Sequence, residues 1–422
     1  MATSPLHTAA IVGKPAAGDW RARLAAALPA SPLILCCYGA LALLGLGLLG
    51  AVIAKLVWPV DAALTNASDQ IAGHDFIAFY AAGRLAAQGE PAATYDLRRM
   101  LEAYFSILVV RPNWTPWAYP PHVLMLVAPL GRLSPTAALA VWYAVLVGAA
   151  VAAVRLVSGS WRLGVAAPLA LPTIVNLAFG QNGTISAALF AVIATCWTRA
   201  PLAAGIALGA LAYKPHFMVV PGLLALCFGA WRIIAAAAAT VAAFVAASLL
   251  AYGIDPWFAW AGAIAGQMQY ITDGRLPVFR LATIYVLLAR AGVPALAALA
   301  LHGAVAAAAF LAALWTWRRS AEPFARALAL TLAALLVPPY AFDYDSAILL
   351  VPIAALVAGG RAAPALTERG FRWMLALSAL PMFVLLVASS VRISPMAPLL
   401  ALLLAIATVQ LVAPRRPQAS AV

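Results

Sequence analysis

The stretch PLILCCYGALALLGLGLLGAVIAKLV, residues 32–57, decides what kind of fold this chain adopts. It is apolar and holds no charged residue before Lys55. About 20 consecutive apolar residues cross the hydrocarbon core of a bilayer as a helix. The basic tail before this run is too long, and the run too extended, for a cleaved signal peptide. We therefore expect a retained first transmembrane helix preceded by a cytoplasmic tail, residues 1–31.

The composition of the whole chain agrees with a membrane protein. Of its 422 residues, 65% are hydrophobic and only 9% are charged, which is too little polar surface for a soluble domain. Further apolar segments follow up to residue 413, and several are short or interrupted by Pro or Gly. Because unpaired backbone cannot face lipid, interrupted segments indicate a cavity, and either 119–133 or 163–180 is expected to be re-entrant. We predict an all-α polytopic protein of the lipid bilayer, with about twelve transmembrane helices over residues 32–413.

Basic residues predict which side of the membrane each loop occupies. The net charge is +13, and arginines gather at the ends of apolar segments, as the positive-inside rule expects of cytoplasmic turns. The positive charge therefore reflects membrane topology, and no nucleic acid partner is expected. Both tails, residues 1–31 and 414–422, then lie in the cytoplasm. Residues 58–118 and 254–282 form two outer loops.

Acidic residues are concentrated in the first outer loop. Six of the 13 acidic residues of the chain lie there: Asp61, Asp69, Asp75, Glu90, Asp96 and Glu102. From Asp75 to Ala87 apolar residues recur at helical spacing, and Gly89-Glu90-Pro91 ends that helix. A second amphipathic stretch runs from Asp96 to Phe105. We expect both helices to lie along the membrane surface and to roof the cavity.

Asp75 has two candidate roles. A carboxylate at the start of a helix accepts hydrogen bonds from free backbone N–H groups, and the residues alone favour this capping role. The same position keeps a carboxylate ionised, which is what a general base requires. The two roles are compatible, so Asp75 is also the leading candidate for catalysis.

Lys214 is the second candidate. It is one of three lysines and lies in Tyr213-Lys214-Pro215-His216, between two short apolar segments on the inferred outer side. An ionisable residue at membrane depth indicates function, and a phosphate group is the natural partner of this lysine. A lysine that snorkels to the interface explains the pattern equally well.

Two further polar stretches interrupt the apolar segments. Gln181-Asn182 lie at a helix–helix corner, where a polar turn with helix capping is the simpler interpretation for Asn182. Asp343 and Asp345 offer two close carboxylates, although capping of the helix from Ser346 explains them more simply. The Cys and His spacing fits no metal site, and no cofactor is expected.

Taken in order, these elements resemble glycosyltransferase family 87, the polyprenyl-phosphate-mannose-dependent mannosyltransferases of the C-type membrane superfamily. The matching pieces are Asp75-Phe76, Tyr80-Ala81-Ala82-Gly83-Arg84, Gly89-Glu90-Pro91, Tyr95-Asp96, Tyr119-Pro120-Pro121, Pro129-Leu130, Gly180-Gln181-Asn182, Lys214-Pro215, and Tyr344-Asp345 before Pro352. Each piece is short, and their order across residues 75–352 makes the resemblance specific. Residues 371–413 carry no such signal.

The resemblance implies a C-type glycosyltransferase fold in a bacterial inner membrane, with the active site facing the periplasm. It further implies inverting transfer of a hexose, mannose in the family, from a polyprenyl-phosphate donor to a glycolipid or glycan acceptor, without a required metal. Asp75 matches the catalytic Asp of the first outer loop. We expect the donor phosphate to contact Lys214, Arg275 and Arg280. The expected substrate contacts are Arg84, Tyr119, Gln181, Asn182, His216, Tyr344 and Asp345.

Two other functions stay open on the sequence. Broken helices and buried charge also serve a transporter or lipid flippase, although the acid-rich first outer loop and the lack of an inverted repeat argue against one. A non-catalytic assembly protein is the third interpretation. In that case Asp75 and Lys214 would be replaceable without loss of function.

Overall fold

A computed structural model describes residues 32–59, 61–108, 117–272, 280–281, 283–359 and 367–412. Over these residues the chain is helical, and its only strand-like pairings are three isolated β-bridges, which confirms the prediction of an all-α protein. The α-helices, in chain order, are α2 (Pro32–Val52), α3 (Phe76–Ala87), α4 (Leu97–Phe105), α5 (Leu124–Val127), α6 (Pro135–Ser158), α7 (Trp161–Ala166), α8 (Leu171–Ala178), α9 (Gly183–Cys196), α10 (Pro201–Ala210), α11 (Val219–Cys227), α12 (Trp231–Tyr252), α13 (Asp255–Thr272), α14 (Ile284–Arg290), α15 (Ala295–Arg319), α16 (Pro323–Leu336), α17 (Leu350–Ala358), α18 (Glu368–Val391) and α19 (Met396–Val412).

Short irregular helices join several of these elements. The 3-10 segments are Pro91–Tyr95, Pro121–Val123, Leu130–Arg132, Ala167–Leu169, Leu211–Tyr213, Pro215–Met218 and Asp343–Leu349, and a π segment, Ile53–Val57, follows α2. Three of them begin at a proline, whose ring sets the φ of a first helical residue and whose missing N–H is not needed there. Lys214 lies between the 3-10 segments Leu211–Tyr213 and Pro215–Met218, at a point where the regular helix is interrupted.

Within the described ranges, five helical stretches are long and apolar enough to cross a membrane: Gly39–Val57, Pro135–Ser158, Trp231–Tyr252, Ala295–Arg319 and Glu368–Val391. A sixth crossing results if Trp161–Leu169 and Leu171–Ala178, which meet at a bend of 51°, are one broken span. The other apolar helices have 10–17 residues, so the prediction of about twelve crossings is not confirmed. The bend falls in residues 163–180, one of the two segments expected to be irregular.

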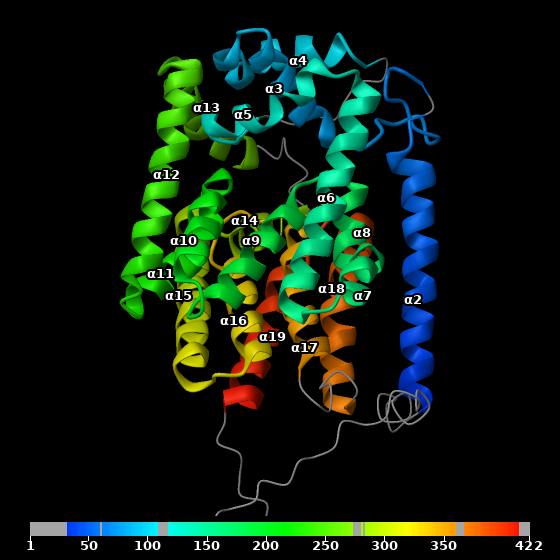
Figure 1. Ribbon diagram of the computed structural model, residues 1–422, viewed down its shortest axis with the longest axis vertical. Helices are drawn as coiled ribbons and strands as arrows, with labels where there is room; N and C mark the ends of the chain where they lie inside the picture. The colour runs from blue at the N-terminus through cyan, green and yellow to red at the C-terminus, as the bar shows by residue number, and fades with distance from the viewer. Residues whose placement is uncertain are drawn as a thin grey trace, which may run out of the picture.

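The long helices stand side by side, and the short helices α3, α4 and α5 form an outer layer across one end of the bundle (Figure 1). The start of α2 and the end of α19 both lie at the opposite end. The end of α6, the start of α12 and the end of α15 also point away from the outer layer (Figure 1), and there the sequence places Arg155, Arg232, Arg318 and Arg319. The outer layer therefore lies away from the arginine-rich helix ends.

The two helices expected in the first outer loop are present as α3 and α4. α4 is amphipathic, with Met100 and Tyr104 buried. α3 is not the surface helix that was expected, because all its residues except Arg84 and Ala87 are buried. It packs on α5, where the carbonyl of Val127 lies 2.2 Å from the position of a Cβ at Gly83. Only a glycine permits this approach, so α3 belongs to the packed interior of the outer layer.

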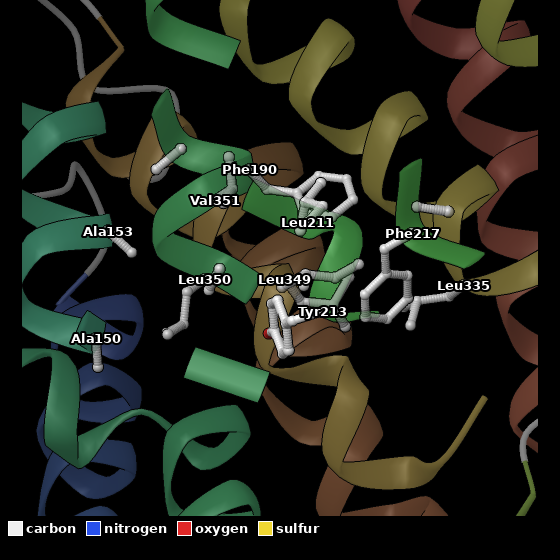
Figure 2. Packing of buried hydrophobic residues seen from close by; sticks show 14 of the residues in the cluster. Ala150, Ala153, Phe190, Leu211, Tyr213, Phe217, Leu335, Leu349, Leu350 and Val351 are labelled. Carbon is white, nitrogen blue, oxygen red and sulfur yellow. The ribbon is translucent and has the colours of Figure 1, made fainter. Parts of the chain in front are cut away.

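Aromatic side chains pack the centre of the bundle. The ring of Phe190 on α9 meets that of Phe217 edge to face, with centroids 5.8 Å apart, and Figure 2 shows Tyr213 in the same cluster. The Tyr213 hydroxyl bonds the hydroxyl of Ser186 over 2.6 Å. This packing holds the backbone that leads directly into Lys214.

Candidate active site

Two segments that are far apart in the chain meet at Asp75. One is the start of α3, and the other is the corner between α8 and α9, residues 179–183. The backbone N–H of Asp75 donates to the carbonyl of Phe179 over 3.1 Å. The carbonyl of Gly73 lies 2.1 Å from the position of a Cβ at Gly180, whose φ is +57°, so only glycine fits there. Backbone contact thus holds the corner against the start of α3.

The Asp75 side chain is buried and held on both oxygens, with 8% of the residue exposed. Oδ1 lies 2.6 Å from Nδ1 of His74, and Oδ2 accepts a 2.8 Å hydrogen bond from Nε2 of Gln181. Asp75 directly precedes α3, but within the described residues its side chain makes no capping hydrogen bond. The capping interpretation is therefore wrong, because side chains and not the helix N–H groups engage the carboxylate.

The surroundings of Asp75 favour its ionised form. Burial by itself raises the pKa of this carboxyl group. The hydrogen bond from His74, the charge that its imidazole carries when protonated, the positive charge of Arg280 and the hydrogen bond from Gln181 outweigh burial, so the pKa of Asp75 lies below its usual value. Asp75 is therefore a carboxylate at neutral pH and can accept a proton.

A chain of hydrogen bonds continues from Gln181. Its Oε1 accepts a 3.4 Å bond from the hydroxyl of Tyr119, which accepts a 3.0 Å bond from Nδ2 of Asn182. Every donor in this chain is directed toward Asp75, which orients the amide of Gln181. Asn182 precedes α9, but its side chain makes no capping bond in the described part of the chain. The capping interpretation is wrong for Asn182 as well.

Lys214 and Arg280 are each buried in an ion pair. Nζ of Lys214 lies 2.6 Å from Oδ1 of Asp345. Arg280 makes two bonds to Asp343, of 2.7 Å from Nη2 and 3.0 Å from Nε. All four residues are at most 6% exposed, so the interpretation of Lys214 as a snorkelling residue is wrong. Asp343 and Asp345 do not form a carboxylate pair, because each binds a cation. The helix expected from Ser346 begins earlier, as the 3-10 segment Asp343–Leu349, and Asp345 accepts the backbone N–H of Phe342, the residue before it, over 3.0 Å.

Aromatic rings connect these cations to the corner. Cζ of Arg280 lies 3.4 Å from the centre of the Phe179 ring and 5.5 Å from that of Tyr344. Nζ of Lys214 lies 5.3 Å from the Tyr344 ring. The carbonyl of Tyr344 is 2.5 Å from the position of a Cβ at Gly183. Both ion pairs therefore lie beside the corner that also holds the carboxylate.

Comparison with known proteins assigns the chain to a family. The model of glycosyltransferase family 87 matches residues 117–339, just over half of the chain. The chain belongs to glycosyltransferase family 87. No curated protein and no solved structure matches it. The matched residues include Gln181, Lys214 and Arg280, whereas Asp75 and Asp345 lie outside them.

Membership of family 87 indicates a membrane glycosyltransferase, which acts on a sugar donor and an acceptor. The five or six apolar helices that can cross a bilayer agree with this class. Nothing in the comparisons favours a transporter. The polar groups at the corner therefore belong to the interior of a transferase.

The remaining predicted residues of this glycosyltransferase differ in their distance from the site. The His216 ring contacts that of Tyr340, with centroids 4.9 Å apart, and within the described ranges its buried Nε2 has no hydrogen-bond partner. Arg84 lies roughly 13 Å further along α3 than Asp75, at 1.5 Å per residue, and its Nη1 contacts Ser106 at 3.4 Å. α3 therefore carries Arg84 away from the carboxylate. Arg275 lies outside the described residues.

Two residues of the site were missed by the sequence reasoning. His74 contacts Asp75 directly, and its position next to Asp75 was the signal that could have found it. Phe179 contacts both His74, whose ring meets it edge-on at 5.3 Å, and the guanidinium of Arg280. One phenylalanine in an apolar segment carries no signal of such a position.

The geometry of the transferase provides two chemical capacities. Each oxygen of Asp75 accepts one side-chain bond and keeps further lone-pair capacity for a hydroxyl proton. Lys214 uses one of its N–H donors in its ion pair, and Arg280 uses two. A lysine has about three donors and an arginine about five, so both cations can bind a phosphate while they stay paired.

Proposed function

We propose that this family 87 enzyme transfers a hexose, mannose by family analogy, from a polyprenyl-phosphate donor to a hydroxyl group of a glycolipid or glycan acceptor. The observation that carries the proposal is an ionised, doubly held carboxylate that interacts with the buried cation of Arg280, while the ring of Tyr344 links the cation of Lys214 to the same corner. A carboxylate suits the removal of a hydroxyl proton, and cations suit a departing phosphate. The corner of residues 179–183 contacts Asp75 through Gln181 and Arg280 through Phe179.

The proposed reaction is a single in-line displacement. The acceptor hydroxyl gives its proton to Asp75 while its oxygen attacks the anomeric carbon of the donor sugar. The bond from that carbon to the phosphate oxygen breaks, and polyprenyl phosphate leaves with the electron pair. Because attack and departure occur on opposite faces of the carbon, the configuration inverts. Asp75 supplies the base for this step.

Lys214 and Arg280 are proposed to stabilise the charge that develops on the leaving phosphate. Their ion pairs with Asp345 and Asp343 hold both cations in place before the donor binds, so little reorganisation accompanies the reaction. A buried ion pair that loses one member leaves an uncompensated charge, which is costly. The phosphate is therefore expected to use the spare N–H donors and not to displace the carboxylates.

The proposed site faces the periplasm of a bacterial inner membrane. The helix ends opposite the outer layer carry arginine, as expected of a cytoplasmic face. Exposed Trp161 and Trp231, at the start of α7 and α12, suit the aromatic belt of that interface, and exposed Trp58 follows α2 at the other end. A donor carried by a polyprenyl chain reaches an outer site through the membrane, whereas nucleotide sugars stay in the cytoplasm.

The direct test is transfer from radiolabelled polyprenyl-phosphate mannose in membranes of the native host that lack the chromosomal gene and carry a plasmid copy. Asp75→Asn removes the base but keeps the size, so transfer is expected to fall by about 10²–10⁴-fold, the range of a positioned base. Asp69→Asn is the matched control, because Asp69 is an exposed carboxylate of the same loop. Undiminished transfer by Asp75→Asn would exclude the assignment.

A further inference from the structure

His74 is the immediate neighbour of the proposed base. Its Nδ1 lies 2.6 Å from Oδ1 of Asp75, and its side chain is 37% exposed against 11% for Asp75. The ring rests edge-on against Phe179, with centroids 5.3 Å apart. Of the two groups, the imidazole has the wider access to solvent. His74 can therefore exchange a proton with water while the carboxylate stays enclosed.

The 2.6 Å contact between Nδ1 of His74 and Oδ1 of Asp75 requires a proton on one of the two atoms. Asp75 is ionised and only accepts hydrogen bonds, so the proton belongs to Nδ1 of His74. In the neutral imidazole the other nitrogen, Nε2, then keeps its lone pair. Uptake of a second proton at Nε2 makes the ring a cation in direct contact with the carboxylate.

We propose that His74 is the positioning residue of Asp75 and makes sugar transfer depend on pH. This inference rests on the proposed function. The Nδ1–H group holds Oδ1, and the amide of Gln181 holds Oδ2, so the carboxylate presents its free lone pairs in one orientation. Protonation at Nε2 places a positive charge beside Asp75, which makes the carboxylate a weaker proton acceptor. Transfer is therefore expected to fall at acidic pH through His74.

Within the described residues, the charged groups near the imidazole besides Asp75 are Arg280, Lys55 and Asp69. Arg280 lies on the ring of Phe179, the ring that His74 also contacts. Lys55 is exposed on the π segment Ile53–Val57, which contacts the His74 loop through the bond from Gly73 N–H to the carbonyl of Leu56. Exposed Asp69 belongs to the same loop. Among the residues that the structure describes, the carboxylate of Asp75 is the charged group recorded in direct contact with the ring.

The backbone of His74 allows an informative substitution. Its φ is +47°, in the left-handed region where Asn, Asp and His are enriched among non-glycine residues. Asparagine therefore fits this backbone, and its side-chain N–H can replace Nδ1–H as donor to Oδ1. Its amide does not titrate. His74→Asn thus separates the hydrogen bond from the proton uptake, and His74→Ala removes both.

The experiment measures kcat and KM for transfer from polyprenyl-phosphate mannose between about pH 5 and 9, for wild type, His74→Asn, His74→Ala and the control Asp69→Asn. His74→Ala is expected to lower kcat by about 10- to 100-fold with little change in KM, part of what a positioned base contributes. His74→Asn is expected to recover most of that loss and to lack the fall at acidic pH shown by wild type. Thermal unfolding in detergent checks that each variant is folded.

The outcomes separate this inference from the proposed function. Wild-type transfer together with full kcat in His74→Ala would overturn the positioning role alone. An unchanged acidic limb in His74→Asn would show that another group titrates, and would overturn the pH role. Absence of transfer by wild type would overturn the proposed function and this inference with it. If His74→Ala does not fold, the profile of His74→Asn decides the pH role by itself.

Discussion

Nε2 of Gln181 donates a 2.8 Å hydrogen bond to Oδ2 of Asp75, across 106 positions of sequence. The bond joins the first outer loop to the corner between α8 and α9. The Tyr119 hydroxyl donates a 3.4 Å hydrogen bond to Oε1 of Gln181 and so orients the Gln181 amide. The proposed base is therefore positioned by a residue of a different segment, and its protonation depends on that contact.

Gln181→Glu is expected to change the pH dependence of transfer. The pKa of Asp75 lies below its usual value, with the Gln181 hydrogen bond among the causes. A base works in its ionised form, which is present above its pKa and lost as the pH falls through it. A second carboxylate at Oδ2 raises the pKa of Asp75, so a loss of transfer caused by protonation of Asp75 itself, separate from the acidic fall proposed for His74, moves to higher pH. Gln181→Leu removes the bond without adding charge and is expected to shift it less; identical profiles for the two variants would contradict this reasoning.

Gly180→Ala is expected to prevent the corner from packing on the start of α3. The added Cβ would lie 2.1 Å from the carbonyl of Gly73, at a φ of +57°, and such substitutions destabilise by more than about 1 kcal/mol. Gly222→Ala in α11 is the control, since nothing among the described residues lies within 4 Å of its Cβ. Thermal unfolding followed by size-exclusion chromatography should show a lower midpoint for Gly180→Ala only. Equal midpoints would show that the corner can relax.

Variants of the ion pair between Lys214 and Asp345 can separate the structural role of Lys214 from its chemical role. Lys214→Met leaves a buried carboxylate unpaired and is expected to cost about 3–5 kcal/mol of stability. The double variant Lys214→Met with Asp345→Asn removes both charges and is expected to recover most of that stability. Transfer should stay low in the double variant, because the cation for the phosphate is absent. Recovery of transfer together with stability would show that Lys214 acts only in folding.

Arg280→Lys is expected to weaken donor binding although it keeps the charge. Lysine cannot form the two bonds to Asp343 or stack as a plane on Phe179. The KM for polyprenyl-phosphate mannose is expected to rise about tenfold, roughly the loss of one charge-assisted bond. Arg98→Lys, at an exposed position of α4, is the control. An unchanged KM in Arg280→Lys would remove Arg280 from the proposed phosphate site.

The sequence predicted the class of fold because hydropathy is a local property. A chain with 65% hydrophobic residues needs lipid around it, and helical periodicity placed α3 and α4 within the first outer loop. The number of crossings was less predictable. Apolar helices of 10–17 residues read like membrane spans in the sequence, but they are too short to cross a bilayer alone.

The surroundings of each candidate residue were decided only by the tertiary structure. The sequence pointed to Asp75, Gln181 and Lys214 as polar residues in apolar surroundings. It indicated a capping role for Asp75 because a helix start is visible locally, whereas the bond from Gln181 is not. It left Lys214 unpaired because Asp345 lies 131 positions away.

By itself, then, the sequence determined that this is a helical membrane protein with a few ionisable groups inside it. The tertiary structure decided which of those groups neutralise each other and that His74 and Gln181 hold the carboxylate of Asp75. The physical reason is that burial is costly for every charge unless a partner is brought to it. Those partners are brought by close backbone packing at Gly180 and Gly183, between segments that are distant in the chain.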